Sequence, residues 1–155
     1  MSEAVYSECG AYRYGLTRVW GVGAQVMFVM LNPSTATELR NDPTIAQCER
    51  RARALGFAGV RIGNLFALRA TDPKALLGAR DPVGPGNDAV LVETAVGAAT
   101  VICAWGNHGL LLGRSHQVEG LLRAGGATLA HLGLTRLAQP RHPLYVRQDQ
   151  PLLMW

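Results

Sequence analysis

Cysteine is scarce in this sequence, and its pattern argues against two common roles. The three cysteines, Cys9, Cys48 and Cys103, are odd in number and lie far apart along the chain. They therefore predict neither a disulfide framework nor a paired zinc site. A buried free cysteine behaves as a small hydrophobic side chain, so we expect these residues to have packing roles, without redox or nucleophilic chemistry.

Long apolar runs are also missing. No segment reaches the roughly 18 uninterrupted apolar residues that a transmembrane helix requires. The first ten residues, MSEAVYSECG, contain two glutamates and neither a basic nor an apolar signal region. We therefore expect no association with a membrane and a cytoplasmic location.

Lysine is nearly absent, so almost all of the positively charged side chains are arginines. Lys74 is the only lysine, and the formal net charge of +4 comes mainly from arginine. Arginine is well suited to bidentate contacts with phosphate groups. A modest positive charge permits nucleic-acid binding but does not establish it.

What is present fits one ordinary globular domain. The chain has 155 residues, with no internal repeat, low-complexity tract or long linker, so we expect a single domain over residues 1–155. Residues 26–31 are apolar on both faces, as a central strand covered by helices should be. Asp42 and Pro43 are typical of a helix start, and Gly56 is typical of the helix end.

Further strands and helices alternate after this first pair. Strands are predicted at about residues 60–64, 100–106 and 127–133; helices are predicted at 71–78, from a cap at Asn87 or Asp88 to about Ala98, and largely across 107–126. This alternation predicts an α/β fold, a three-layer α/β/α sandwich with a short, mainly parallel central sheet. Residues 12–21 predict an N-terminal antiparallel edge strand, paired with residues 25–31 as a hairpin across Gly21–Gly23.

Polar and aromatic residues follow each strand of the predicted sheet. In such a sheet, ligands bind outside the carboxyl ends of the strands. We therefore expect one crevice there, lined by the residues that follow three strands and by a C-terminal loop. These residues are Asn32-Pro33-Ser34-Thr35, Asn64-Leu65-Phe66, Trp105-Gly106-Asn107-His108, and Arg141, His142 and Tyr145.

The chemistry expected in this crevice is that of amides and one imidazole. The sequence has no phosphate-binding glycine loop, no dinucleotide fingerprint, no cluster with metal-ligand spacing and no Gly-x-Ser-x-Gly motif, so we expect no metal and no cofactor. Asn32 and Asn64 each offer a donor and an acceptor, which suits a nucleobase edge or a water. Phe66 offers an aromatic face for stacking, and His142 a hydrogen bond to developing negative charge.

Each of these residues also has a purely structural interpretation. Asn, Pro and Ser are common in turns because of their backbone preferences, so residues 32–35 could form a turn without binding a ligand. Asn64 suits the satisfaction of backbone groups at a strand end, and Trp105 suits a place in the core. Asp42 and Pro43 are interpreted as a helix start alone.

Six motifs in order carry a resemblance to a known family: LNPSTA, NDPT, NLFALRAT, DPVGP, AWG and HPLY. Together they resemble an uncharacterised bacterial and phage family that is catalogued as a domain of unknown function. The resemblance extends from about Tyr12 to Tyr145. It implies no particular activity.

The order of motifs is also distantly similar to that of the uracil-DNA glycosylase superfamily. The motif Leu31-Asn32-Pro33 matches that superfamily, and the resemblance implies that the side chain of Asn32 positions the attacking water. It also implies that Asn64 forms hydrogen bonds with the base edge. Trp105 matches the end of a third strand in that superfamily. His142 would stabilise the base anion, and Leu144 would act as a wedge in the duplex.

The sequence departs from the superfamily pattern in two places. His-Pro-Ser is replaced by His-Pro-Leu at residues 142–144, and no aromatic residue follows the first motif. Either Phe66 takes the place of that aromatic residue and stacks on the base, or no residue stacks there. Ser34 is expected to contact the substrate. The resemblance further implies contacts with DNA from Thr35, Arg69, Arg141 and Tyr145.

These observations together predict a protein that recognises a nucleobase in DNA. The leading hypothesis is a glycosylase that hydrolyses the N-glycosidic bond of a damaged or deaminated base. One alternative is a non-catalytic module of the same fold that binds nucleic acid or nucleotides. A third is an enzyme that acts on free nucleosides or nucleotides.

Overall fold

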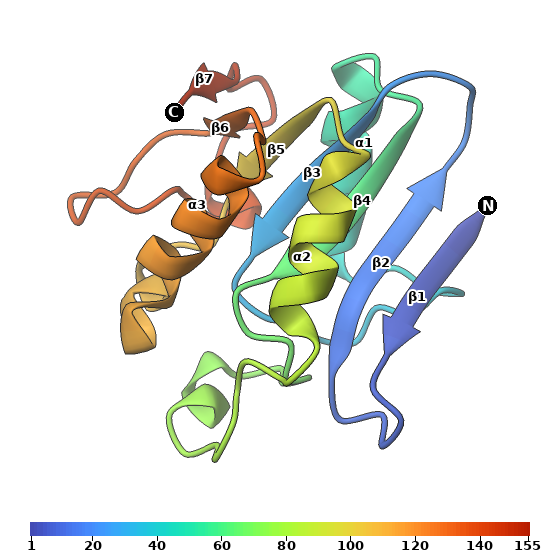
Figure 1. Ribbon diagram of the computed structural model, residues 1–155. Helices are drawn as coiled ribbons and strands as arrows, with labels where there is room; N and C mark the ends of the chain where they lie inside the picture. The colour runs from blue at the N-terminus through green and yellow to red at the C-terminus, as the bar shows by residue number, and fades with distance from the viewer.

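The computed structural model describes residues 1–155 as one seven-stranded mixed sheet with three α-helices (Figure 1). The strand order across the sheet is β1-β2-β4-β3-β5-β6-β7. The strands are β1 (Ser2–Tyr6), β2 (Arg13–Val19), β3 (Gln25–Met30), β4 (Gly59–Asn64), β5 (Thr100–Cys103), β6 (Leu129–His131) and β7 (Leu153–Met154). The helices are α1 (Pro43–Ala54), α2 (Asn87–Val96) and α3 (Arg114–Ala124), with short 3-10 helices η1 (Pro73–Leu76), η2 (Asn107–Gly113) and η3 (Pro143–Tyr145).

The centre of the sheet is parallel and its edges are antiparallel. Strands β4, β3, β5 and β6 pair in parallel, as the alternation of strands and helices predicts. Strands β1 and β2 at one edge, and β7 at the other, run antiparallel to their neighbours. The sheet is therefore mixed rather than mainly parallel, and its N-terminal edge holds two strands instead of the single one predicted.

The predicted hairpin between residues 12–21 and 25–31 is wrong. Strand β2 pairs with β4, with Leu16 opposite Ile62, and with β1 on its other side. Strand β3 instead lies between β4 and β5. Its two apolar faces explain this, because a strand buried on both faces belongs in the parallel centre of a sheet covered by helices. The connection at Gly21–Gly23 still reverses the direction of the chain, but it crosses past β4, so β2 and β3 are not neighbours.

Two hydrophobic clusters fill the space on opposite faces of the sheet. Helix α1 contributes Ile45 and Cys48 to the cluster that contains Phe28. Helices α2 and α3 contribute Leu91 and Val118 to the cluster on the other face. In Figure 1, α2 and α3 stand in front of the sheet and α1 lies behind it. The sheet is thus covered by helices on both faces, and its α/β class is confirmed.

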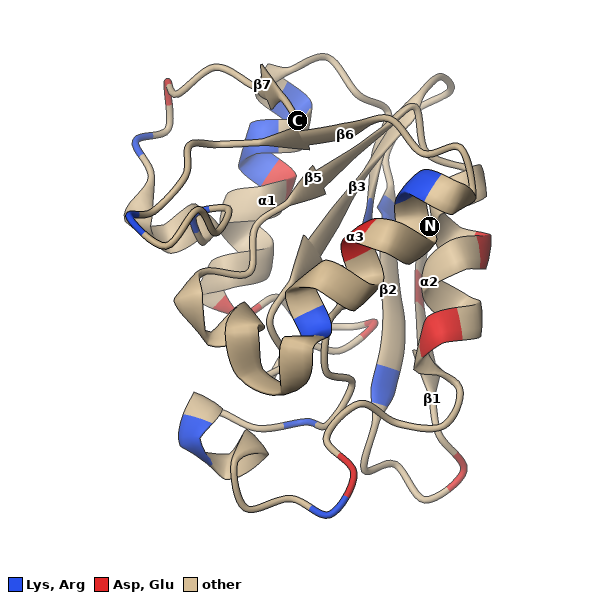
Figure 2. Cartoon of the chain, turned by 60° about the vertical axis from the view of Figure 1, so that its left-hand side comes forward, with Lys and Arg blue, Asp and Glu red and all other residues tan.

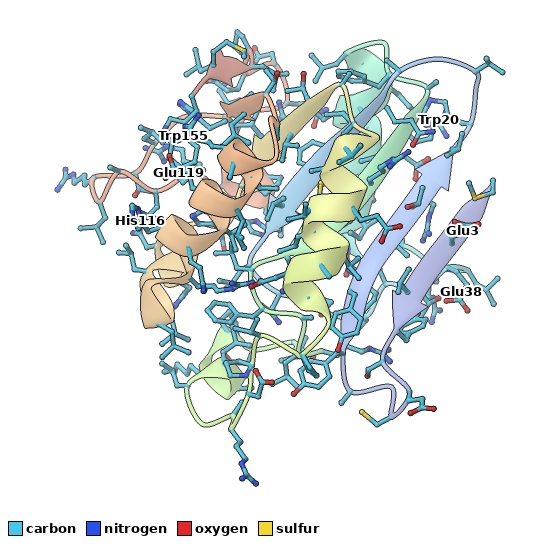
Figure 3. The ribbon with its side chains drawn as sticks, viewed as in Figure 1. Glu3, Trp20, Glu38, His116, Glu119 and Trp155 are labelled. Carbon is cyan, nitrogen blue, oxygen red and sulfur yellow. The ribbon has the colours of Figure 1, made fainter.

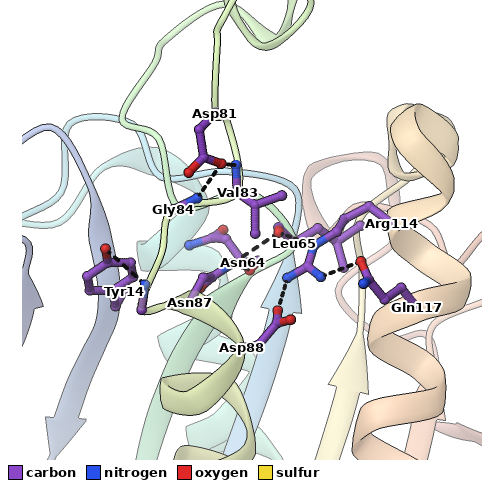
Figure 4. A network of polar contacts seen from close by, with 11 residues as sticks. Tyr14, Asn64, Leu65, Asp81, Val83, Gly84, Asn87, Asp88, Arg114 and Gln117 are labelled. Atoms are coloured by element: carbon purple, nitrogen blue, oxygen red, sulfur yellow. Dashed lines mark hydrogen bonds and ion pairs between the residues drawn. The ribbon is translucent and has the colours of Figure 1, made fainter.

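The N-cap predicted for α1 is confirmed, whereas the one predicted for α2 is wrong. Asp42 caps α1, and its side chain accepts a hydrogen bond from the backbone N–H of Ile45, as predicted. The predicted side-chain cap of α2 is wrong, because Gly86 occupies the cap position and makes no such bond. The side chain of Asn87 instead donates to the carbonyls of Asn64 and Leu65, so it holds the end of β4 (Figure 4).

The C-terminal segment closes one edge of the sheet. Trp155, labelled beside α3 in Figure 3, packs with its ring centroid 5.9 Å from that of Trp105 and 6.0 Å from that of His131. Its backbone N–H donates to the carbonyl of Leu129. None of the helices has the length and apolarity that spanning a membrane requires.

Candidate functional site

Two adjoining hollows lie at the carboxyl ends of β3 and β4. The small cavity has a volume of about 40 Å³ and is lined chiefly by polar residues, among them Asn32, Asn64 and His142. The large cleft has a volume of about 610 Å³ and extends toward the loops after β5 and β6. The two hollows are adjacent, because four residues line both of them: Asn32, Ser34, Thr44 and His142.

Asn32, which follows β3 by two residues, has a fixed orientation. Its Nδ2 donates to the carbonyl oxygen of Ala70 at 2.8 Å and to that of Pro33 at 3.1 Å. Two carbonyl acceptors require the amide nitrogen on that side. The Oδ1 atom is therefore left as the polar group of Asn32 that a ligand or a water can use, and it acts only as an acceptor.

Asn64, the last residue of β4, is buried without a polar partner. Its side chain is 2 % exposed, and neither Oδ1 nor Nδ2 forms a hydrogen bond within the protein. An unsatisfied buried polar group costs about 1–3 kcal/mol, so such a residue calls for an explanation. Asn64 lines the small cavity, where a ligand with both a donor and an acceptor would satisfy its amide.

His142 is held in one tautomer when it is neutral. Its Nδ1 accepts a hydrogen bond of 3.3 Å from the backbone N–H of Leu144, so the proton lies on Nε2. Burial lowers the pKa of His142 below its ordinary value, and the nearby carboxylate of Asp42 opposes that shift. The imidazole is therefore neutral at neutral pH and has an Nε2–H donor free for a ligand.

Two charged residues complete the small cavity, and sequence reasoning gave neither of them a site role. Asp42 lines it in addition to capping α1, and Arg13 lines it from the start of β2. The cap motif was the only signal for Asp42. The position of Arg13 depends on β2 running antiparallel to β4, which brings the start of one strand to the end of the other. The sequence analysis paired residues 12–21 with residues 25–31 instead, so it gave no reason to place Arg13 near Asn64.

The aromatic role predicted for Phe66 is wrong. Its side chain is fully buried in the cluster that contains Leu65 and Leu31, so no base can stack on it. Its backbone N–H still bonds the carbonyl of Leu31, and this continued pairing turns the side chain into the core. Trp105 is also nearly buried, with Nε1 donating to Gln139 at 3.0 Å, although it does line the large cleft.

The other predicted site residues divide into two groups. Pro33 lines the small cavity, Ser34 lines both hollows, and the large cleft is lined by Leu31, Arg141, Leu144 and Tyr145. Thr35 and Arg69 line neither hollow. Arg69 instead donates to the carbonyl of Gly10 and lies over the ring of Tyr6. The hydroxyl of Tyr6 donates to Glu38, which is labelled in Figure 3.

The large cleft also contains residues that sequence reasoning missed. Thr71 and Pro73 come from the segment around η1, and Thr135 comes from the loop after β6. The hydroxyl of Thr135 donates to Asn107 at 2.6 Å, which links the loops after β5 and β6. No strand ends at these residues, so strand exits alone gave no signal for them.

The fold and the site together define an α/β protein with an amide-lined cavity at the carboxyl ends of its parallel strands. The family model described as "Protein of unknown function (DUF1643)" matches residues 13–144. The chain therefore belongs to the DUF1643 family. A search of curated proteins and a search of solved structures each found no match.

Proposed function

We propose that this protein recognises a nucleobase in DNA and hydrolyses its N-glycosidic bond. The observation that carries the proposal is the buried amide of Asn64, whose donor and acceptor have no protein partner. A nucleobase edge presents adjacent donors and acceptors that complement such an amide. The resemblance to the uracil-DNA glycosylase superfamily, including an α/β/α sandwich of that kind, belongs to the same proposal.

The dimensions of the two hollows support this assignment. Ligand-binding clefts commonly have volumes of about 300–1,000 Å³, and the large cleft is about 610 Å³. In the proposed complex the flipped nucleotide occupies this cleft, and the edge of its base points into the small cavity. Tyr145, which is 80 % exposed at the cleft, replaces Phe66 as the aromatic residue for stacking.

The reaction that we propose uses three side chains of the small cavity. Asn64 pairs with the base edge while the Nε2–H of His142 donates to a base oxygen that gains negative charge. Asn32 Oδ1 accepts a hydrogen bond from a water and directs its oxygen toward the sugar carbon. An amide is a poor general base, so the proposal includes slow turnover.

Charge on one side of the molecule supports approach by DNA. Figure 2 shows several basic residues and one acidic residue on α1, and further basic residues on the loops near the C-terminus, whereas the charged residues of α2 are all acidic. Arg51 ties these two basic regions together, because its guanidinium donates to the carbonyls of Arg147, Gln148 and Gln150. Arg141 lines the large cleft itself, where it can contact a phosphate of the proposed nucleotide.

The first test is single-turnover cleavage of labelled oligonucleotides that carry uracil, hypoxanthine, xanthine or a mismatch. We expect abasic sites with the wild type and none with Asn32→Ala or His142→Ala. His116→Ala serves as the matched control, because His116 is exposed on α3 and lines neither hollow. Failure to cleave any of these substrates would refute the glycosylase.

A non-catalytic nucleobase-binding module is the second candidate. One observation favours it: Asp42, the only carboxylate that lines the small cavity, accepts a backbone N–H at each of its oxygens, which gives it a structural role there. For such a module we expect binding that weakens steeply with salt, without cleavage. Binding of free nucleosides that is insensitive to salt would instead indicate the third alternative.

A further inference from the structure

Four arginines of this protein are buried, and three of them have partners that explain their burial. Arg114 donates to the carbonyl of Leu65, to Gln117 and to Asp88 (Figure 4). Arg51 donates to three backbone carbonyls of the C-terminal loop. Arg18 donates to Asn41 and to the carbonyl of Thr37. Each of these guanidinium groups therefore holds segments of the protein together.

Arg13 differs from the other three. It is 2 % exposed, yet it makes a single side-chain hydrogen bond, from Nη1 to the carbonyl of Ala36 at 2.7 Å. Its Nε is buried without a partner, as is Nη1 of Arg18, and like Arg18 and Arg51 it forms no ion pair, but those two residues make several hydrogen bonds each. A guanidinium has five N–H donors, and a buried charge without a partner is costly. Packing alone therefore does not explain this residue.

The surroundings of Arg13 are those of a binding site. It lines the small cavity together with Asn64, whose amide also has no partner. Asp42 lines the same cavity, but its two oxygens accept the N–H groups of Ala36 at 3.3 Å and Ile45 at 2.9 Å. Burial lowers the pKa of Arg13 to about 10, against the opposing effect of Asp42, so the guanidinium remains charged at neutral pH.

We propose that Arg13 is an anion-binding residue of the small cavity, which takes a planar ligand edge bearing a negatively charged oxygen. The inference rests on the proposed function in one respect: the ligand there is the base that leaves as an anion. When the N-glycosidic bond breaks, its electron pair leaves with the base and delocalises onto a carbonyl oxygen beside Arg13. The water oxygen bonds to the sugar carbon, and one water proton finally moves to the base nitrogen.

The direct test observes the Arg13 side chain in the wild-type protein by NMR. The Arg Nε–H resonances are assigned with Arg13→Lys and followed during titration with sodium nitrate, a small planar oxyanion, and separately with free xanthine. We expect the Arg13 resonance to shift in a saturable way with nitrate and with xanthine. The Nε–H of Arg114, which is already bonded to Leu65, serves as the matched control and should not move.

A second measurement separates charge binding from a structural role. The affinity for xanthine is measured as the base is converted from its neutral to its anionic form by raising the pH. We expect wild type to prefer the anion, Arg13→Gln to lose at least tenfold in affinity for the anion alone, and Arg13→Lys to retain part of the preference. Equal loss for both forms, or no loss, would overturn the inference.

The outcomes for Arg13 and for the proposed function are distinct. A nitrate-dependent shift of Arg13 in a protein that cleaves no oligonucleotide and binds no base would support the anion site and refute the nucleobase assignment. Cleavage by the wild type with no shift of Arg13 in nitrate or xanthine would keep the glycosylase and overturn the role of Arg13.

Discussion

Arg13 and Asp42 hold the two ends of the same buried residue, Ala36. Arg13 Nη1 donates to the carbonyl oxygen of Ala36 at 2.7 Å, and Asp42 Oδ2 accepts from its N–H at 3.3 Å. The loop that carries Asn32 and Ser34 is thereby tied to the start of β2 and to the start of α1. Opposite charges fix this loop through a backbone group between them, without an ion pair of their own.

Replacement of Asp42 should destabilise the protein more than loss of an ordinary cap does. Asp42→Ala removes the α1 cap and also the bond to Ala36, so we expect a loss of about 2 kcal/mol in the free energy of unfolding. Asp42→Asn keeps an oxygen for one of the two bonds and should lose less. Urea unfolding measures both variants. Asp72→Ala, which removes the exposed cap of η1, is the control, and equal effects at the two positions would contradict the prediction.

Replacement of Asn64 by an apolar residue should abolish nucleobase binding without lowering the stability of the protein. In Asn64→Leu an unpartnered buried donor and acceptor are replaced by an apolar side chain of similar size, a change that is typically neutral or stabilising. We expect an unchanged or higher melting temperature and no binding of a nucleobase, measured by thermal unfolding and by calorimetric titration. A clear loss of stability would show that the amide has a structural partner after all.

His142 should make activity and stability depend on pH in the same direction. Because burial holds its pKa below the ordinary value of 6.5, the unfolded chain binds a proton more readily than the folded protein does. The stability that neutral His142 contributes is therefore present above about pH 6.5 and is lost as the pH falls through the folded pKa. Protonation also abolishes the bond from Leu144, since Nδ1 then carries a proton.

Titration of the imidazole by NMR measures the folded pKa of His142 directly, and cleavage rates against pH should fall over the same range. The stability profile of His142→Ala should be flatter than that of wild type. It should not become flat, because burial also lowers the pKa of His131. A cleavage rate that rises as His142 becomes protonated would contradict the neutral donor.

Arg114 and Arg13 should respond differently to the same substitution. Arg114→Gln deprives Asp88 and Gln117 of their guanidinium partner and leaves the carbonyl of Leu65 with the amide of Asn87 alone, so we expect a loss of about 2–3 kcal/mol in the free energy of unfolding. Arg13→Gln removes a charge that has one bond and should cost less. Urea unfolding compares the two, and a greater loss at Arg13 would indicate a structural role for it.

Local sequence patterns were sufficient for most elements of the sheet centre and for the main polar residues of the site. The strand ending before Leu31, the helix capped by Asp42 and the strand ending in Asn64 were each predicted close to their true bounds. Parallel strands bring their carboxyl ends to one edge, which is why Asn32, Asn64 and His142 could be predicted to share a cavity from their positions in the chain.

Strand pairing was decided by the tertiary structure. The partner of β2 depends on which strand takes the parallel centre, and that competition between segments distant in the chain has no local signature. Arg13 entered the cavity through this pairing. The burial of Phe66 also depends on strand pairing, because the backbone N–H of Phe66, after β4, still donates to the carbonyl of Leu31, after β3. The sequence by itself thus determined which residues could form an amide-rich site, and the non-local packing of β2 placed the positive charge of Arg13 inside it.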